Sequence, residues 1–357
     1  MRIQPIRVLK PGQKIRVLVV DDSVVIRRLV CHALEEEPSI EVVAVASDGA
    51  LALRRVAQVN PDVITLDVEM PEVDGIEMLR RLRMNDLQTR VVMFSTMTER
   101  GAVATLEALS LGADDYVTKA SNAGSLDVSL ASLRSQLIPK IRQFFRSEAM
   151  PAIEKPRYTP AARLHGQVEA VAIGVSTGGP AALAVIVPQF PADFDIPVFI
   201  VQHMPPLFTR LLAERLNSMT SLIVKEASSG EPVQPRTIYV APGDHHMLVH
   251  RASRGFEIAL SQEAPQNSCR PSVDVLFDSL AEACGKSTVA AVLTGMGQDG
   301  RVGAERLAAQ GAYIMAQDEA SSVVWGMPAA VVRAGIAQQV LPLGKIVPAI
   351  VEHAVHP

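Results

Sequence analysis

Two groups of side chains in this sequence have types and spacing suited to chemistry, and the first group is acidic. Asp21 and Asp22 come directly after the apolar run 15–20, and Asp67 comes directly after the run 62–66. Three carboxylates gathered at strand ends cannot all stay ionised without a cation, and oxygen ligands of this kind suit Mg²⁺. The pattern predicts a Mg²⁺ pocket in which one carboxylate, Asp67, attacks the phosphorus of an incoming phosphoryl group.

Two residues that follow later apolar runs complete this predicted pocket. Lys119, after the run 114–118, supplies a fixed positive charge, and Ser95, which ends the run 90–95, can donate a hydrogen bond to phosphoryl oxygens. Taken singly, acids at strand ends are usually solvated loop residues, and a lone lysine is usually a surface charge. The occurrence of the whole set in this order favours a phosphorylation site over those interpretations.

The second group centres on a serine between glycines. Ser176 lies in the sequence Gly-Val-Ser-Thr-Gly-Gly at residues 174–179, after the apolar run 170–173. A G-x-S-x-G turn between a strand and a helix exposes a serine oxygen for attack, and amides at the start of the helix can stabilise an oxyanion. A glycine-rich loop that holds an anion is an equal alternative for this motif. No lysine follows Gly179-Pro180, which argues against a nucleotide-binding P-loop.

A nucleophilic serine needs a base, and the base needs an acid that orients it. His203 is the first candidate for the base, because it follows the next apolar run, 198–201, and His245-His246 is the second candidate. Asp299 is the only acid in the glycine-rich segment 295–300 and is the candidate for the orienting acid. An aspartate in such a position is also commonly a helix N-cap.

The first part of the chain alternates short β-branched runs with helical patterns, which predicts a doubly wound parallel (βα)5 sheet. In such a sheet the active pocket lies at the carboxyl ends of the strands, where the acidic group falls. The expected strands are 15–20, 41–46, 62–66, 90–95 and 114–118, with helices near 24–36, 49–58, 74–84, 101–110 and 125–146.

The second part alternates in the same way, with a hairpin-like middle around 222–262. This pattern predicts a second doubly wound α/β domain with a mixed, mainly parallel sheet. The expected strands are 170–174, 197–201, 222–226, 237–241, 256–260, 288–293 and 312–316, and the expected helices are 179–187, 206–217, 272–284, 299–309 and 344–354.

Composition shifts give the expected boundaries of the domains. Residues 1–14 are expected to be a flexible N-terminal tail, and residues 15–143 the first domain. Residues 144–167 contain three prolines among charged residues and are expected to be a linker. Residues 168–357 form the second domain, so that a chain of 357 residues contains two.

Hydropathy and cysteine usage indicate the compartment. No apolar run approaches the ~18–20 residues that cross a bilayer, and the N-terminus lacks the features of a signal peptide. The three cysteines, Cys31, Cys269 and Cys284, have no metal-ligand spacing. We therefore expect reduced, inert thiols in a cytoplasmic protein that does not insert into the membrane.

The distribution of charge bears on the partners. The net charge is −4, made up of +1 for residues 1–167 and −5 for residues 168–357. An acidic second domain argues against binding of nucleic acid, because DNA-binding output domains usually show a basic face. A phosphorylation-switched transcription regulator is therefore the less favoured alternative.

The first domain resembles the response-regulator receiver family. The matching residues are Asp21-Asp22, Asp67-Val68-Glu69-Met70-Pro71, Asp74-Gly75, Ser95 and Lys119. The resemblance implies that a histidine kinase supplies the phosphoryl group to Asp67, with Mg²⁺ held by Asp21, Asp22, Asp67 and the backbone carbonyl of Glu69. It also implies that Tyr116 is a switch aromatic. Ala120 departs from the family, which usually has proline there.

The second domain resembles the catalytic domain of the CheB family of chemotaxis protein-glutamate methylesterases. The resemblance implies a catalytic triad of Ser176, His203 and Asp299, with Thr177 and Met296 in supporting positions. The matching segments are 174–180, Gln202-His203-Met204-Pro205, Ala241-Pro242-Gly243, Arg270-Pro271-Ser272-Val273-Asp274, 295–300 and Gly326-Met327-Pro328, while Trp325 stands where many relatives have tyrosine.

Together the two resemblances imply a hydrolase switched on by phosphorylation. The expected reactions are hydrolysis of glutamate methyl esters and deamidation of specific glutamines on methyl-accepting chemoreceptors. No metal or organic cofactor is expected in the esterase domain. A phosphorylation-gated adaptor or binding module, in which the serine loop holds an anion and no ester is cleaved, is the alternative.

Overall fold

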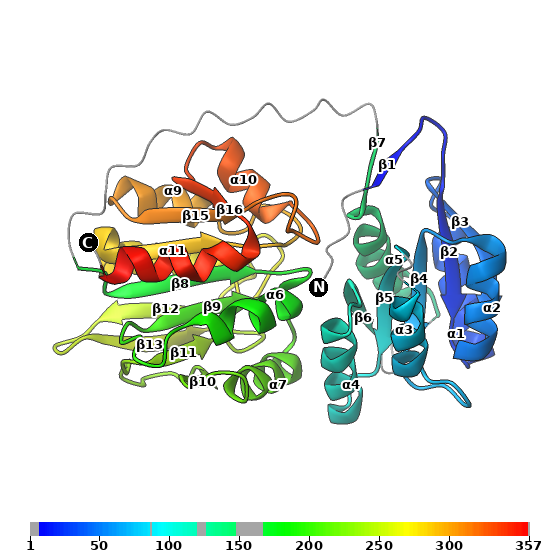
Figure 1. Ribbon diagram of the computed structural model, residues 1–357, viewed down its shortest axis with the longest axis horizontal. Coiled ribbons are helices and arrows are strands. Elements are labelled where there is room, and N and C mark those ends of the chain that lie inside the picture. The colour runs from blue at the N-terminus through cyan, green and yellow to red at the C-terminus, as the bar shows by residue number, and fades with distance from the viewer. Residues whose placement is uncertain (1–6, 86–87, 120–125, 148–166, 356–357) are drawn as a thin grey trace. The chain divides into compact units, whose positions relative to one another are not determined.

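The computed structural model describes residues 7–85, 88–119, 126–147 and 167–355. The chain divides into two compact units, Met1–Ala152 and Ile153–Pro357, which we describe one at a time (Figure 1). Ala120, the linker residues 148–166 and the first six residues of the expected tail lie outside the described residues. Every helix within the described ranges is too short or too polar to span a membrane.

The N-terminal unit is built on a five-stranded sheet whose strand pairs are all parallel, in the order β3-β2-β4-β5-β6. Helix α1 packs with α5, and α3 packs with both α2 and α4. This is the doubly wound arrangement that the alternating pattern predicted. Its elements are β2 (Ile15–Val20), α1 (Val24–Glu35), β3 (Ile40–Ala46), α2 (Gly49–Val59), β4 (Val63–Asp67), α3 (Gly75–Met84), β5 (Arg90–Ser95), α4 (Glu99–Ser110), β6 (Asp115–Thr118) and α5 (Leu126–Arg142).

Local sequence fixes where the helices of this unit begin. Ser23, Asp48, Asp74 and Thr98 each accept a hydrogen bond from a backbone amide in the first turn of the helix that follows. A cap of this kind stabilises a helix by about 1 kcal/mol. The caps therefore set the helix starts on the side of the sheet where the strands end, which is the side that carries the acidic residues.

Two short strands were not expected from the sequence. β1 (Arg7–Leu9) pairs in parallel with β7 (Phe145–Ser147), whereas residues 1–14 were predicted to be a flexible tail and residues 144–167 a linker. The amide of Arg7 donates to the carbonyl of Phe144 at 3.1 Å, and the Phe144 side chain is fully buried. Strands of three residues are too short to show an alternating pattern, which is why the sequence did not reveal them.

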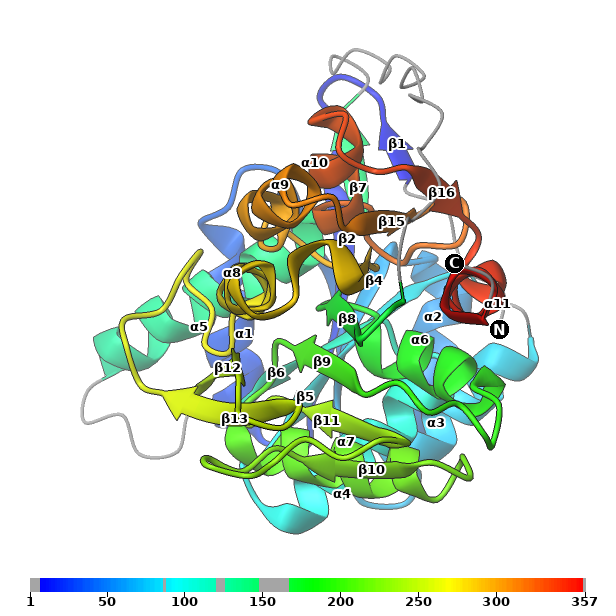
Figure 2. The ribbon, with the colours of Figure 1, turned by 90° about the vertical axis from the view of Figure 1, so that its left-hand side faces the viewer.

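The C-terminal unit contains a seven-stranded sheet in the order β10-β11-β9-β8-β14-β15-β16, and all its strand pairs are parallel. Figure 2 shows α8 and α9 on one side of this sheet and α6 and α11 on the other. The strands are β8 (Ala170–Val175), β9 (Val198–Gln202), β10 (Ile223–Glu226), β11 (Thr237–Val240), β14 (Thr288–Val292), β15 (Tyr313–Gln317) and β16 (Gln339–Leu341). The helices are α6 (Gly179–Ile186), α7 (Pro206–Asn217), α8 (Val273–Ala283), α9 (Arg301–Ala309), α10 (Met327–Arg333) and α11 (Leu343–Val355), with single 3-10 turns at Val187–Gln189 and Gly285–Ser287.

The expectation of a mixed sheet is corrected in one respect. Antiparallel pairing occurs between β12 (His246–Arg251) and β13 (Phe256–Ser261), which form a separate two-stranded sheet outside the parallel one. The sequence pattern did not reveal β12, β16 or α10. The hairpin nevertheless packs against α8, so the α/β class is confirmed and the hairpin is an addition to it.

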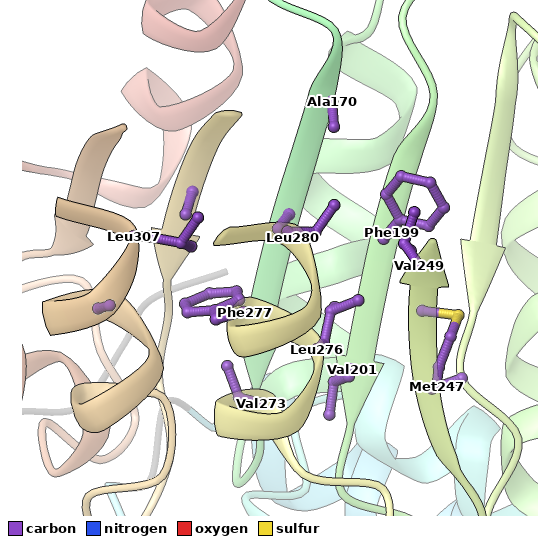
Figure 3. Packing of buried hydrophobic residues seen from close by; sticks show 14 of the residues in the cluster. Ala170, Phe199, Val201, Met247, Val249, Val273, Leu276, Phe277, Leu280 and Leu307 are labelled. Carbon is purple, nitrogen blue, oxygen red and sulfur yellow. The ribbon is translucent and has the colours of Figure 1, made fainter. Parts of the chain in front are cut away.

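The core of the C-terminal unit fixes the position of α8. Leu276, Phe277 and Leu280 of this helix are fully buried with Phe199 and Val201 of β9 (Figure 3). Truncation of a buried phenylalanine to alanine costs about 3–5 kcal/mol, so this packing holds the helix firmly on the sheet. The first turn of α8 contributes two backbone amides to the site described next.

Candidate active site and acidic pocket

Ser176 and His203 are placed side by side by the register of two neighbouring strands. Val175, the last residue of β8, is paired with Gln202, the last residue of β9. The amide of His203 then donates to the carbonyl of Val175 at 3.3 Å. Each candidate residue is therefore the first one beyond its strand, at the carboxyl edge of a parallel sheet.

The turn that carries Ser176 is held from three sides. The Ser176 amide donates to the carbonyl of Thr294 at 3.0 Å, and the Ser176 carbonyl accepts from the Gly179 amide at 2.8 Å. The side-chain amide of Gln202 donates to the same carbonyl at 3.0 Å. Gly178 has a φ of 77°, a left-handed conformation that favours glycine. The turn leaves Ser176 partly exposed at the start of α6.

Asp299 comes from the loop after β14 and is 2% exposed. One carboxylate oxygen, Oδ2, lies 2.8 Å from Nε2 of His203 and 2.7 Å from the amide of Val273. The other, Oδ1, accepts from the Ser272 hydroxyl at 2.8 Å and from the amide of Asp274 and side chain of Asn267 at 3.1 Å. Asp299 thus occupies the N-terminus of α8 rather than capping the helix that follows it, whose N-cap is Gly300.

These contacts shift the pKa values of both partners. Burial acts to raise the pKa of Asp299, but the hydrogen bonds from His203, Val273 and Ser272 lower it to about 2. Burial acts to lower the pKa of His203, but the bond to Asp299 and the contact with Cys269 raise it to about 9. An ionised Asp299 requires a proton on Nε2 of His203, which leaves Nδ1 as the basic nitrogen of the neutral ring.

The thiol of Cys269 contacts Nδ1 of His203 in this structure. Its Sγ lies 3.5 Å from Nδ1 of His203, and the thiol is partly exposed. Within the described residues, no hydrogen bond joins the Ser176 hydroxyl to His203. The sequence analysis treated all three thiols as inert. Burial raises the pKa values of Cys31 and Cys284, which fits that expectation, but Cys269 lies inside the site. Its position directly before Arg270-Pro271 was the one feature of the sequence that could have indicated a role for Cys269 in the site.

The remaining predicted residues lie around this centre. Thr177 is buried, and its carbonyl accepts from the Thr294 hydroxyl at 2.9 Å. Met296 is 43% exposed. The second candidate for the base is not brought to Asp299: the His246 ring is buried with Nε2 3.3 Å from the carbonyl of Ala264, and the His245 ring contacts the carbonyl of Gly243.

Asp274, named above only within a matching segment, is a second buried acid near Asp299. Asp274 accepts from the amide of Gly303 at 2.7 Å and from the side-chain amide of Asn267 at 2.8 Å. Asn267 therefore bridges the carboxylates of Asp274 and Asp299. Burial, together with the charge of Asp299, raises the pKa of Asp274 to about 6.

The acidic pocket of the N-terminal unit brings together the residues that the sequence predicted. Nζ of Lys119 lies 2.8 Å from Oδ2 of Asp21 and 2.7 Å from Oδ2 of Asp67. Carboxylate oxygens of Asp21, Asp22 and Asp67 all lie within 4.8 Å of one another. An oxygen-only set at this spacing fits a hard divalent cation such as Mg²⁺.

Burial controls the charge on Asp67. Burial raises its pKa to about 6, and the ion pair with Lys119 opposes that rise while the charge of Asp21 adds to it. The raised pKa means that charges and hydrogen bonds of the protein alone do not offset the cost of burying the ionised Asp67 carboxylate. This is the electrostatic condition in which a bound cation stabilises the carboxylates.

Ser95, the last residue of β5, and Tyr116, in β6, are both buried. The Ser95 hydroxyl donates to the carbonyl of Gly101 at 3.0 Å, so in this structure it is engaged with α4. The Tyr116 ring lies inside the unit with Nζ of Lys140 5.2 Å from its centre. The Glu69 side chain is exposed, and its backbone contributes a hydrogen bond to Asp67.

The fold and these two sites define a class of protein: a receiver-type α/β unit joined to a parallel α/β unit that carries serine, histidine and aspartate at neighbouring strand ends. Residues 17–131 match the response regulator receiver domain, and residues 171–350 match the CheB methylesterase family. The chain belongs to the CheB methylesterase family and has an N-terminal receiver domain.

Relatives match almost the whole chain. A protein-glutamate methylesterase/protein-glutamine glutaminase of Trichodesmium erythraeum is 48% identical over 93% of this chain and 97% of its own length. A protein of the same name from Nocardioides sp. is 47% identical over 95% of each chain. The crystal structure of the Thermotoga maritima CheB methylesterase catalytic domain is 42% identical and covers 52% of this chain and 99% of its own, with a TM-score of 0.51.

Proposed function

We propose that this protein is a phosphorylation-activated protein-glutamate methylesterase and protein-glutamine deamidase that acts on methyl-accepting chemoreceptors. The observation that carries the proposal is the hydrogen bond between His203 and Asp299, 2.8 Å long, at the strand ends where Ser176 also lies. Family membership selects the ester substrate. We place the protein in the cytoplasm, where its phosphodonor and the receptor glutamates are found.

In the proposed reaction the Ser176 hydroxyl attacks the carbonyl carbon of the glutamyl ester. Nδ1 of His203 takes the serine proton and then delivers it to the leaving methoxide, so that methanol departs. Asp299 holds the ring by accepting the Nε2 proton. Water, deprotonated by the same nitrogen, then cleaves the glutamyl-serine ester and restores Ser176. For a glutamine substrate ammonia leaves in place of methanol.

The side chains around Ser176 support this chemistry. The Cys269 thiol must give up Nδ1 of His203 when Ser176 donates its proton there, and rotation of the partly exposed thiol is sufficient. We assign the donors for the oxyanion to backbone amides of the turn that contains Thr177, since the Gly179 amide donates to the Ser176 carbonyl and Pro180 has no N–H. Met296 is exposed and follows Gly295, where an added Cβ would lie 2.8 Å from Cβ of Ser176. The reaction as written uses no metal or organic cofactor.

The proposed switch is phosphorylation of Asp67 by the histidine kinase of a chemosensory system. Asp21, Asp22 and Asp67, with the backbone carbonyl of Glu69, would hold Mg²⁺, which neutralises charge on the phosphoryl oxygens. Lys119, released from its carboxylate partners, then pairs with the phosphoryl group. Ser95 must turn from the Gly101 carbonyl to donate to the phosphoryl group, and this change is the proposed signal, to which Tyr116 would respond as the switch aromatic.

The domain boundaries belong to this proposal. Residues 15–143 form the receiver and residues 168–357 form the catalytic domain, with a linker at 144–167. The strand pair β1–β7 extends the ordered part of the first unit on both sides of the proposed receiver.

The test is methanol release from methylated cytoplasmic fragments of chemoreceptors, with and without acetyl phosphate and Mg²⁺. We expect release that rises with the phosphodonor and that falls by about 10⁶-fold in Ser176→Ala, as in other serine triads. The matched control is Ser218→Ala, an exposed serine at the end of α7. Absence of release from a folded, phosphorylated protein would favour the adaptor alternative.

A further inference from the structure

We propose that Cys269 and His203 form a binding site for a thiophilic divalent cation, with Zn²⁺ as the probe, and that its occupancy stops the esterase. The site lies at Nδ1 of the His203 ring, on the edge opposite Nε2, the nitrogen that is bonded to Asp299. The inhibitory consequence rests on the proposed function, because it requires His203 to be the base. The binding itself does not depend on the reaction.

The separation of the two donor atoms suits a tetrahedral ion. Sγ of Cys269 lies 3.5 Å from Nδ1 of His203. A tetrahedral Zn²⁺ with a sulfur ligand at about 2.3 Å and a nitrogen ligand at about 2.0–2.1 Å separates these two ligands by roughly 3.5 Å. The two donor atoms are therefore already at the separation of two ligands of one tetrahedral ion.

The His203 ring already presents the nitrogen that a metal needs. Because Nε2 faces Asp299 at 2.8 Å, the free lone pair is on Nδ1, the atom next to Cys269. A metal-bound histidine usually donates its other ring nitrogen to a carboxylate, which fixes the tautomer and strengthens the ligand. Asp299 has this role here, and the hydrogen bonds from Ser272 and the amides of α8 hold it in place.

The donor types select the metal. The group of Cys269, His203 and Asp299 offers sulfur and nitrogen, whereas the group of Asp21, Asp22 and Asp67 offers oxygen alone. Thiolate and imidazole ligands favour Zn²⁺ and Co²⁺, and carboxylates favour Mg²⁺. Two protein ligands leave the other positions of the ion to water. Cys269 and His203 are partly exposed, so an ion can enter and leave.

Binding and catalysis compete for one lone pair. When Zn²⁺ binds, the Cys269 thiol loses its proton to solvent, a protonated His203 ring also loses the proton on Nδ1, and Sγ and Nδ1 each donate an electron pair to the ion. No oxidation or reduction takes place. Nδ1 of His203 can then no longer accept the Ser176 proton, and the first step of ester cleavage stops.

The binding test is a titration of the full-length protein with Co²⁺ in excess Mg²⁺, which keeps the oxygen-only pocket occupied. We expect a thiolate-to-cobalt charge-transfer absorption that Zn²⁺ displaces. The absorption should be lost in Cys269→Ser and retained in Cys31→Ser and Cys284→Ser, which are matched controls for the other thiols. His203→Gln, with its fold checked by thermal denaturation, should weaken Co²⁺ binding at least about tenfold.

Methanol release measured in parallel separates this proposal from the proposed function. We expect Zn²⁺ to inhibit release, a chelator to restore it, and Cys269→Ser to need at least about tenfold more Zn²⁺ for the same fractional inhibition. Absorption in a protein that releases no methanol would support the metal site and count against the esterase. An active esterase with no absorption, or with absorption that survives in folded Cys269→Ser, would overturn the metal site.

Discussion

His203 and Asp299 are 96 positions apart in the chain, yet Nε2 of one lies 2.8 Å from Oδ2 of the other. His203 follows β9 and Asp299 follows β14, and both strands are neighbours of β8, which Ser176 directly follows. The order of the sheet thus brings three distant loops to one edge. The N-terminus of α8 completes the arrangement. Its backbone amides hold the Asp299 carboxylate in place, and this carboxylate orients the His203 ring.

The first prediction concerns pH. His203 must be neutral to act as the base, and its pKa is raised from 6.5 to about 9. A raised pKa keeps the ring protonated, and therefore inactive, over more of the neutral range. We expect kcat/KM for methanol release to increase with pH through about 9, measured on constitutively active or phosphorylated protein. A profile already flat above pH 7 would contradict this shift.

The same pair has a defined effect on stability. Because the folded-state pKa of His203 is raised, its contribution is fully present below the unfolded value of 6.5 and is lost as pH rises through about 9. The pKa of Asp299 is lowered, so its contribution is present above the unfolded value of 3.8 and is lost as pH falls through about 2. The pH at which the base becomes active is therefore also where the contribution of protonated His203 to stability is lost.

A second prediction concerns Asp67. Its pKa is raised from 3.8 to about 6 by burial, so that ionisation at neutral pH opposes folding of the receiver. This cost is absent below pH 3.8 and complete above about 6. We expect Asp67→Asn to stabilise the receiver at pH 7 by on the order of 1 kcal/mol, measured by urea unfolding without Mg²⁺.

Mg²⁺ provides the control for that variant. We expect Mg²⁺ to stabilise the wild-type receiver, by about 2.7 kcal/mol at a hundred times its dissociation constant, and to have much less effect on Asp67→Asn. Equal stabilisation of both proteins would show that the cation binds elsewhere.

A third prediction concerns the close approach of α3 to the phosphorylation site. A Cβ built on Gly75 would lie 2.0 Å from the backbone oxygen of Asp67, so a side chain there forces the helix and the strand apart. We expect Gly75→Ala to destabilise the receiver by at least about 1–3 kcal/mol and to slow phosphorylation by acetyl phosphate. Gly344→Ala is the control, because nothing lies within 4 Å of that position in α11. Equal stability of the two variants would disprove the steric argument.

Local patterns in the sequence were sufficient for most elements of the two large sheets but not for β1, β7, β12, β16 and α10. Contacts between distant loops were not predictable from them. The run 15–20 and the helix near 49–58 match β2 and α2 closely, because the apolar pattern that leads to burial and the residue that caps a helix both lie within a short segment. Asp299 was predicted as the orienting acid, with a helix N-cap as the alternative, but the position of its carboxylate at the start of α8 depends on packing between distant segments. Cys269 was assigned as inert because its proximity to His203 depends on the path of a loop and not on any periodic pattern.

The last prediction separates the support of Asp299 from the stability of α8. The Ser272 hydroxyl donates to Oδ1 of Asp299 at 2.8 Å, and the Ser279 hydroxyl, on the same helix, accepts from the amide of Val249 at 3.0 Å. Both serines are buried, so Ser272→Ala and Ser279→Ala both lose a buried hydrogen bond. Only Ser272→Ala removes a donor to a charged group, an interaction of about 1.5–3 kcal/mol.

We expect kcat to fall roughly 10- to 100-fold in Ser272→Ala, with KM little changed and the limb of the pH profile shifted. Ser279→Ala should keep its kcat. Equal losses of kcat in the two variants would mean that the helix as a whole, and not the hydrogen bond to Asp299, sets the rate.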